Sequence, residues 1–276
     1  IRPSSVDDAA TVLNQIWKDR VPTIVVDRVD QLETTDGAAA RVSLRNLNRI
    51  VRIDAVNLAA IVEAGVTVRT LRDELAKTVL WCPALRWLPE NETIGCAVAG
   101  GHGRRSRRYG AIADYLLGGR FGVPSVGLVR HGGLAIKNAT GYNLTGTIAG
   151  SRGLFAVVLE VNLRLVPRPN QRVVRRYRAA RASDAWSAAE SLRNAWCPSG
   201  QGATPSVSPA AMEIRAPLSG GSAELQIEAE SEAAPDVWSP AVSNLDAEPL
   251  HADEAGPWSG FDPLVNHSTV RVAVEP

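Results

Sequence analysis

The chain has 276 residues, which is enough for one large domain or two modest ones with a buried core. Its 30 Lys and Arg residues and 29 Asp and Glu residues leave a net charge of +1, which argues against a partner such as nucleic acid or an anionic membrane. The hydrophobic fraction is 45%, but no apolar run approaches the roughly 20 residues of a membrane helix, so we expect no transmembrane segment.

Cysteine and histidine usage adds two expectations. Cys82, Cys96 and Cys197 are odd in number and widely spaced, which matches neither a zinc site nor a disulfide framework. The four histidines do not cluster, and we predict no metal site. No charged and then apolar leader follows Ile1. We therefore expect a cytoplasmic protein, with any membrane association made through partner chains.

Apolar spacing predicts a helix near the N-terminus, because Val6, Leu13 and Trp17 share one face behind an N-cap at Ser4 or Ser5. Short runs rich in β-branched residues then predict buried strands. A second helix, capped by Thr67, runs to Ala76. The predicted strands cover residues 23–26, 42–44, 50–54 and 59–65.

A second part of the fold is predicted from about Pro89, with a glycine-interrupted strand over 116–123 and a long strand over 154–166. The prolines of 167–170 mark a natural boundary, since proline cannot continue a strand ladder. Beyond this boundary the patterns predict a helix over 183–192, a strand over 223–230 and irregular backbone over 238–261.

The segment 93–110, Thr-Ile-Gly-Cys-Ala-Val-Ala-Gly-Gly-His-Gly-Arg-Arg-Ser-Arg-Arg-Tyr-Gly, is the most informative part of the chain. Glycine and alanine at this density let backbone N–H groups approach a flat or anionic ligand. A glycine-rich surface turn followed by a solvated basic run explains the same residues. Two further blocks, 137–144 and 150–161, follow at fixed spacing and favour the ligand-binding interpretation.

Taken in order, these blocks resemble the FAD-binding domain of the vanillyl-alcohol oxidase / p-cresol methylhydroxylase superfamily, and in particular the FAD-binding subunits of bacterial glycolate oxidase. The resemblance covers roughly residues 1–170. Each motif is weak by itself, whereas the ordered series is specific. The residues that carry it lie at 43–54, 62–71, 93–95, 108–110, Asp114, Gly133, 137–138, 141–142, 150–153 and 163–168.

The resemblance implies an α+β fold. A PCMH-type two-lobed FAD-binding domain would span 1–170, with lobes at about 1–80 and 81–170, and a short, truncated α+β cap region would span 171–276. It also implies a cofactor site, in which the Thr-Ile-Gly block lies along FAD and the strand at Val157 meets its other end. The implied cofactor-binding residues are Thr93, Ile94, Gly95, Cys96, Ala99, Gly100, Gly101, Arg108, Tyr109, Gly110, Val157 and Val158.

Several residues depart from the family pattern. After the first strand the family places a glycine-rich loop that cradles the diphosphate, whereas this chain has Arg28, Val29 and Asp30. Bulky residues block the positive-φ conformations of such a loop, and Asp30 would repel phosphate. Asn143 replaces a carboxylate of the family, and Cys96 replaces a glycine.

Roles for three side chains stay open. Cys96 could be a covalent flavin link or a small buried thiol, and the second is more common for a lone cysteine. His102 could donate a proton near the flavin or lie in solvent. Arg108 could neutralise the cofactor or belong to an exposed basic run. Because no histidine precedes His102, a histidyl link from the first lobe is excluded, and we predict non-covalent FAD.

Two functions follow from the resemblance. In the first, the chain is a subunit of an FAD-dependent oxidoreductase that oxidises a small 2-hydroxy acid such as glycolate or lactate. Electrons would then pass to partner subunits of flavin-containing and iron–sulfur types. In the second, the chain is a flavin-free structural subunit that keeps the fold as an interaction surface. The related oxidoreductases supply their acid/base residues from the cap and a returning C-terminal segment, so no catalytic base is nominated.

Overall fold

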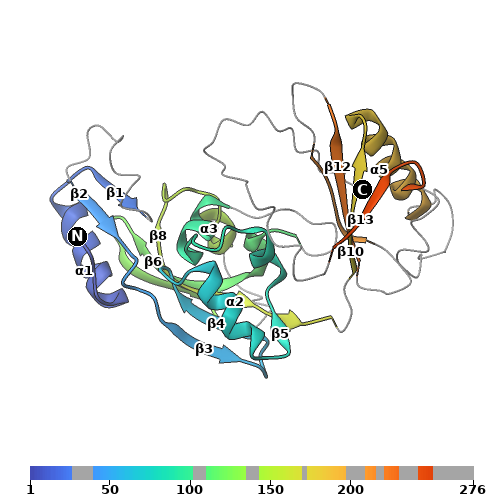
Figure 1. Cartoon of the computed structure of the whole chain (residues 1–276). Coiled ribbons are helices and arrows are strands. Elements are labelled where there is room, and N and C mark those ends of the chain that lie inside the picture. Colours follow the sequence, from blue (N-terminus) through green and yellow to red (C-terminus); the bar gives the residue numbers. More distant parts are fainter. Residues whose placement is uncertain are drawn as a thin grey trace. The chain divides into compact units, whose positions relative to one another are not determined.

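The computed structural model describes residues 1–26, 40–101, 110–134, 143–169, 173–196, 209–215, 221–229 and 242–250 (Figure 1). The chain forms two compact units. The first comprises residues 1–104 and 111–168, and the second comprises residues 105–110 and 169–276. The main passage from one unit to the other falls between Arg168 and Pro169.

The first unit begins with helix α1 (Val6–Lys18), whose apolar face is buried as its spacing predicts. Ser5 is the N-cap, and its Oγ accepts a hydrogen bond of 3.1 Å from the Asp8 N–H. Strand β1 (Thr23–Val26) follows and pairs in parallel with β2 (Ala40–Ser43). The predicted first helix and first strand are confirmed.

A five-stranded antiparallel sheet forms the centre of this unit. Its strands are β3 (Ile50–Asp54), β4 (Ala59–Glu63), β8 (Val157–Arg164), β6 (Leu116–Val123) and β7 (Gly127–Gly132), in that spatial order. The central strand β8 pairs with β4 on one side and with β6 on the other. One sheet therefore joins strands from both of the lobes that the sequence predicts.

Helices and short elements complete the first unit. Thr67 caps α2 (Val68–Ala76) through its side chain, as predicted. Strand β5 (Leu80–Trp81) pairs with β9 (Val166–Pro167), so the predicted strand over 154–166 is shorter and interrupted at Leu165. The remaining helical segments are η2 (Pro83–Trp87), α3 (Ile94–Gly100), η3 (Ile112–Tyr115) and α4 (Leu144–Ile148). Helix α3, which the glycine-rich segment forms, was not predicted from the sequence.

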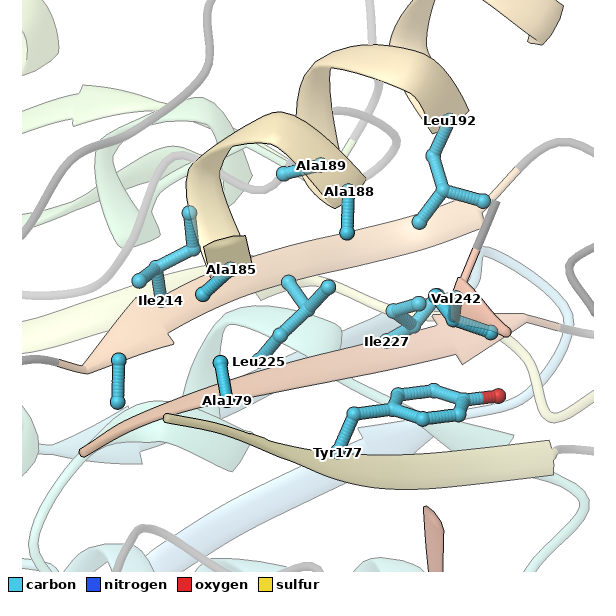
Figure 2. Packing of buried hydrophobic residues seen from close by; sticks show 11 residues of the cluster. Tyr177, Ala179, Ala185, Ala188, Ala189, Leu192, Ile214, Leu225, Ile227 and Val242 are labelled. Atoms are coloured by element: carbon cyan, nitrogen blue, oxygen red, sulfur yellow. The ribbon is translucent and has the colours of Figure 1, made fainter. Parts of the chain in front are cut away.

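The second unit is an antiparallel sheet with one helix packed on it. The strands are β10 (Val173–Ala179), β11 (Pro209–Arg215), β12 (Ala223–Ala229) and β13 (Asp246–Leu250), in the spatial order β11-β12-β10-β13. Figure 2 shows Ala185, Ala188 and Leu192 of α5 (Ala182–Trp196) facing Leu225 and Ile227 of the sheet. This small apolar cluster is the core of the unit.

One sequence prediction in this unit is wrong. Residues 246–250 form β13 rather than the irregular backbone predicted over 238–261. The segment has low intrinsic strand propensity, but pairing with β10 from Arg178 and Asp246 to Val174 and Leu250 overrides it. Pro249 is tolerated because β13 is an edge strand of this sheet.

Candidate functional site

A pocket of about 390 Å³ lies within the first unit, between α1, β1, α3 and the start of β8. This volume falls within the range of small-molecule sites, about 300–1,000 Å³. Its wall is mostly apolar and small. The lining residues are Leu13, Trp17, Thr23, Ile24, Val25, Leu44, Ala64, Gly65, Thr93, Gly95, Cys96, Ala99, Pro124, Arg152, Gly153, Ala156, Val157 and Val158.

Close packing of α3 against the end of β4 shapes one wall of the pocket. A methyl group on Gly95 would lie 2.7 Å from the Cβ of Ala64 and 3.0 Å from its carbonyl oxygen. Contacts this short do not occur between real atoms, so a side chain at position 95 would push α3 away from the sheet. The glycine of the Thr-Ile-Gly block therefore sets the distance between α3 and the sheet.

The backbone donors at the start of α3 are bonded within the protein. The Ile94 N–H donates to the Val66 carbonyl and the Gly95 N–H to the Ala64 carbonyl, both at 2.8 Å. The Cys96 N–H donates to Oγ1 of Thr93, the N-cap, at 3.3 Å. From the sequence, this block is expected to supply both a slot and backbone donors. The structure shows the slot, whereas these three donors are occupied.

Residues 150–152 bond to the C-terminal end of α3. The Gly150 N–H donates to the Val98 carbonyl at 3.0 Å, and the Arg152 N–H donates to the Ala99 carbonyl at 2.7 Å. Gly101 ends the helix at φ 64°, and a methyl group there would lie 2.9 Å from the Cα of Gly150. The Thr-Ile-Gly block and the Gly-Ser-Arg-Gly block, about fifty residues apart in sequence, thus form one continuous wall.

Half of the predicted cofactor-binding residues meet in this pocket. Thr93, Gly95, Cys96 and Ala99 line one side, and Val157 and Val158 line another. Ile94 is fully buried in the core, and Gly100 and Gly101 are not among the lining residues. Gly110 has φ 74° and belongs to the second unit. Arg108 and Tyr109 lie outside the described residues, as do His102 and the loop at 27–39.

Other parts of the pocket wall were not predicted from the sequence. Trp17 of α1, residues 23–25 of β1, Pro124 and Arg152 all line the pocket, although none was nominated. Arg152 lies inside the Gly-Ser-Arg-Gly block, so its charge directly before one glycine and two residues after another could have drawn attention to it. Trp17 carried no such signal, because it fits the apolar face of α1 equally well.

Two buried carboxylates lie side by side on neighbouring strands of the central sheet, and neither lines the pocket. Glu63 and Glu160 are paired in register between β4 and β8. Glu63 accepts bonds from the Arg49 backbone N–H at 2.9 Å and from the Arg49 guanidinium at 2.7 and 3.0 Å. Burial raises the pKa of Glu160, and Arg120 and Arg130 oppose that rise. This pair belongs to the sheet rather than to the candidate site.

The two described cysteines differ in their surroundings. Cys82 is buried, and that burial raises the pKa of its thiol to about 12. Cys96 is half-buried and lines the pocket. A small residue on the pocket wall fits the simple-thiol interpretation, whereas a covalent link to flavin stays a hypothesis.

Within the part of the chain that the structure describes, no helix is long and apolar enough to cross a membrane.

Comparison with known families agrees with this geometry. Residues 1–131 match the family described as FAD binding domain. The match includes α1, β1, α3 and most of the central sheet, and so it includes three of the pocket's walls. The resemblance to FAD-binding domains that the sequence predicts is confirmed, and the match supports FAD as the cofactor.

Curated relatives include proteins of two related activities. Glycolate oxidase subunit GlcD of Bacillus subtilis is 27% identical over 61% of this chain and 37% of its own length. Glycolate oxidase subunit GlcE of Escherichia coli is 30% identical over 44% of this chain and 35% of its own length. D-lactate dehydrogenase of Archaeoglobus fulgidus is 34% identical over 42% of this chain. The matched part thus spans roughly a third of these relatives or less, at 37%, 35% and 26% of their lengths.

Solved structures show the same fold. A structure of alkyldihydroxyacetonephosphate synthase superposes with a TM-score of 0.70 at 16% sequence identity, over 94% of this chain and 54% of that chain. A second crystal form of the synthase gives a TM-score of 0.69. At this identity the likeness establishes the mixed α/β fold alone. It does not show that residues 171–276 form a truncated cap.

Proposed function

We propose that this chain is the FAD-binding part of an oxidoreductase that oxidises a small 2-hydroxy acid such as glycolate or lactate. The observation that carries the proposal is the pocket itself, because the Thr-Ile-Gly block, which lies inside the segment that matches the FAD binding domain family, meets there a second motif about fifty residues further along the chain. Relatives named as glycolate oxidase subunits and D-lactate dehydrogenases support the substrate class.

The residues of the pocket fit part of a dinucleotide cofactor. Ala99, Gly153 and Ala156 are small, so a planar ring could approach the backbone of α3 and β8 closely. Trp17 and Val25 add apolar surface that would keep water from the ring. The hydroxyl of Thr93 accepts from Cys96 and keeps its own proton available for a ligand.

When bound, FAD supplies a two-electron acceptor for the hydride that leaves the α-carbon of a 2-hydroxy acid. The hydroxyl proton of that acid needs a separate base. Among the described residues that line the pocket there is neither a carboxylate nor a histidine. We infer that the base comes from another segment of the protein, and that the role of this pocket is to bind and orient the cofactor.

Electron transfer to a partner is the second part of the proposal. Two of the relatives are named as subunits of one oxidase, so we propose a heteromeric complex in which the electrons pass to flavin-containing or iron–sulfur partner chains. The odd number of widely spaced cysteines supports a reducing, cytoplasmic location. Residues 171–276 would form a short cap region in this complex.

A flavin-free structural subunit is the alternative, and one observation favours it. The N–H groups of Ile94, Gly95 and Cys96 already have acceptors in the protein, so they cannot replace a diphosphate loop. Arg28, Val29 and Asp30 stand where the resembled family has glycines. If the loop and α3 both fail to hold phosphate, the fold would persist without its cofactor.

A pocket-filling substitution separates these functions. Ala99→Leu adds three carbons on the pocket wall, whereas Ala76→Leu makes the same change at an exposed position of α2. FAD titration of the wild type and both variants, followed by quenching of flavin fluorescence, should show loss of binding in Ala99→Leu alone. Anaerobic addition of glycolate, D-lactate or L-lactate, with any purified partner chains, should then bleach the bound flavin.

Absence of FAD binding by the wild-type chain would favour the structural subunit. Equal binding by Ala99→Leu and wild type would mean that FAD binds elsewhere.

A further inference from the structure

Arg152 occupies an unusual backbone conformation at the edge of the pocket. Its φ is 54°, in the left-handed region that non-glycine residues seldom adopt, and it lies between Ser151 and Gly153, the latter at φ 81°. The hydrogen bond from its N–H to the Ala99 carbonyl at 2.7 Å fixes this conformation. An arginine in place of the more permissive glycine or asparagine points to a use for its side chain.

The charge of Arg152 is isolated in an otherwise neutral wall. Of the described residues that line the pocket, it alone has an ionised side chain. Among all the residues that the structure describes, none makes a hydrogen bond or an ion pair with the guanidinium of Arg152. A guanidinium presents five donors in a planar fork that matches phosphate oxygens.

We propose that Arg152 binds the phosphate groups of FAD and takes over part of the role of a glycine-rich diphosphate loop. This inference rests on the proposed function, since it names how the same pocket holds its cofactor. The neighbours of Arg152 support the cofactor rather than the substrate as its ligand. Its backbone N–H bonds to Ala99 of α3. Gly153 continues the same wall to Val157, a predicted cofactor-binding residue at the start of β8.

Arg152 has one competing role, which is structural. Its N–H bonds to a carbonyl at the C-terminal end of α3, where a positive side chain is favourable to the helix dipole. In that role the arginine would stabilise the fold and leave the affinity for cofactor unchanged. Binding and stability therefore have to be measured on the same variants.

The test compares Arg152→Asn and Arg152→Lys with Arg20→Asn. Asparagine tolerates the left-handed conformation, so the first variant removes the charge and keeps the backbone. Arg20 is a matched control, because it is exposed, has the same φ of 54° and does not line the pocket. Dissociation constants for FAD and riboflavin are measured by fluorescence titration at low and high salt, and thermal unfolding is measured without ligand.

We expect Arg152→Asn to weaken FAD binding roughly tenfold, which corresponds to about 1.4 kcal/mol. Riboflavin has no phosphate, so its affinity should not change. Arg152→Lys should retain most of the FAD affinity, Arg20→Asn should match the wild type, and high salt should reduce the difference between Arg152→Asn and the wild type.

Three results would overturn the inference. FAD binding that is equal in Arg152→Asn and wild type would do so, with or without a drop in thermal stability, and would assign the arginine to α3. A loss of riboflavin affinity equal to that of FAD would place the arginine at the ring. A change confined to the binding of glycolate or lactate, titrated into the FAD-loaded variants, would make it a substrate residue. Failure of the wild-type chain to bind FAD would instead contradict the proposed function itself.

Discussion

Replacing Gly95 by alanine should destabilise the first unit, although alanine is the better helix former. Alanine gains about 1 kcal/mol over glycine inside a helix. The added methyl group would lie 2.7 Å from the Cβ of Ala64, and overpacking of this kind costs about 1–3 kcal/mol. With about 2 kcal/mol for the clash, Gly95→Ala should lower the free energy of unfolding by about 1 kcal/mol in total.

The compensating change Ala64→Gly makes this prediction specific. Alone, Ala64→Gly should lower the free energy of unfolding by up to about 1 kcal/mol, because glycine loses more conformational entropy than alanine on folding. In the double variant the 2.7 Å contact is absent, but the added methyl group still lies 3.0 Å from the Ala64 carbonyl oxygen, so most of the clash is relieved rather than all of it. The expected coupling energy is therefore up to about 2 kcal/mol in favour of the pair.

Urea unfolding followed by far-UV circular dichroism, with FAD affinity measured beside it, would give the three free-energy changes. Gly95→Ala should also weaken FAD binding, because α3 would move relative to β8 across the pocket. A single variant as stable as the wild type, or free-energy changes that simply add, would refute the argument that Gly95 sets the distance between α3 and the sheet.

Three further predictions concern charge, thiol chemistry and the loop after β1. The pKa of Glu160 is raised in the folded state, so its carboxylate lowers stability as the pH rises through that pKa. Glu160→Gln should therefore match the wild type at acid pH and exceed its unfolding free energy at neutral pH, and a constant difference across pH would contradict this. Iodoacetamide at pH about 8 should spare Cys82, whose thiol pKa of about 12 keeps it protonated. It should label Cys96 more slowly once FAD is added, and mass spectrometry of the peptides would show equal labelling if the pocket is not the FAD site. Replacement of residues 28–30 by three glycines should raise FAD affinity in titration, because a positive-φ loop returns and Asp30 is removed. Unchanged or weaker binding would mean that this loop does not limit the site.

Regular, locally encoded elements could be predicted from the sequence. The N-caps Ser5 and Thr67 each stand before a clear helical spacing, and both helices form where that spacing predicts. Runs rich in β-branched residues likewise located β1 and β3, and the glycine-interrupted run over 116–123 located β6. In each case the side chains that decide the local structure lie within a few residues of one another.

Elements decided by distant contacts could not be predicted in this way. Four of the seven residues of α3 are glycine or alanine, which gives little helical signature, yet the helix forms because Ala64 and Gly150 bond to its two ends. Strand β13 exists because β10 offers it an edge. The mutual approach of Arg152 and Ala99 depends on the same long-range packing, and so Arg152 was not recognised as part of the site.

The visible absorbance of the purified chain, before and after acid precipitation, tests most directly whether this pocket holds non-covalent FAD. We expect flavin absorption bands in the near ultraviolet and the blue, with about one FAD per chain either as isolated or after incubation with the cofactor. We also expect precipitation to release all of the flavin into the supernatant. A chain that stays colourless after incubation with FAD would contradict the central claim, and flavin retained in the pellet would contradict non-covalent binding.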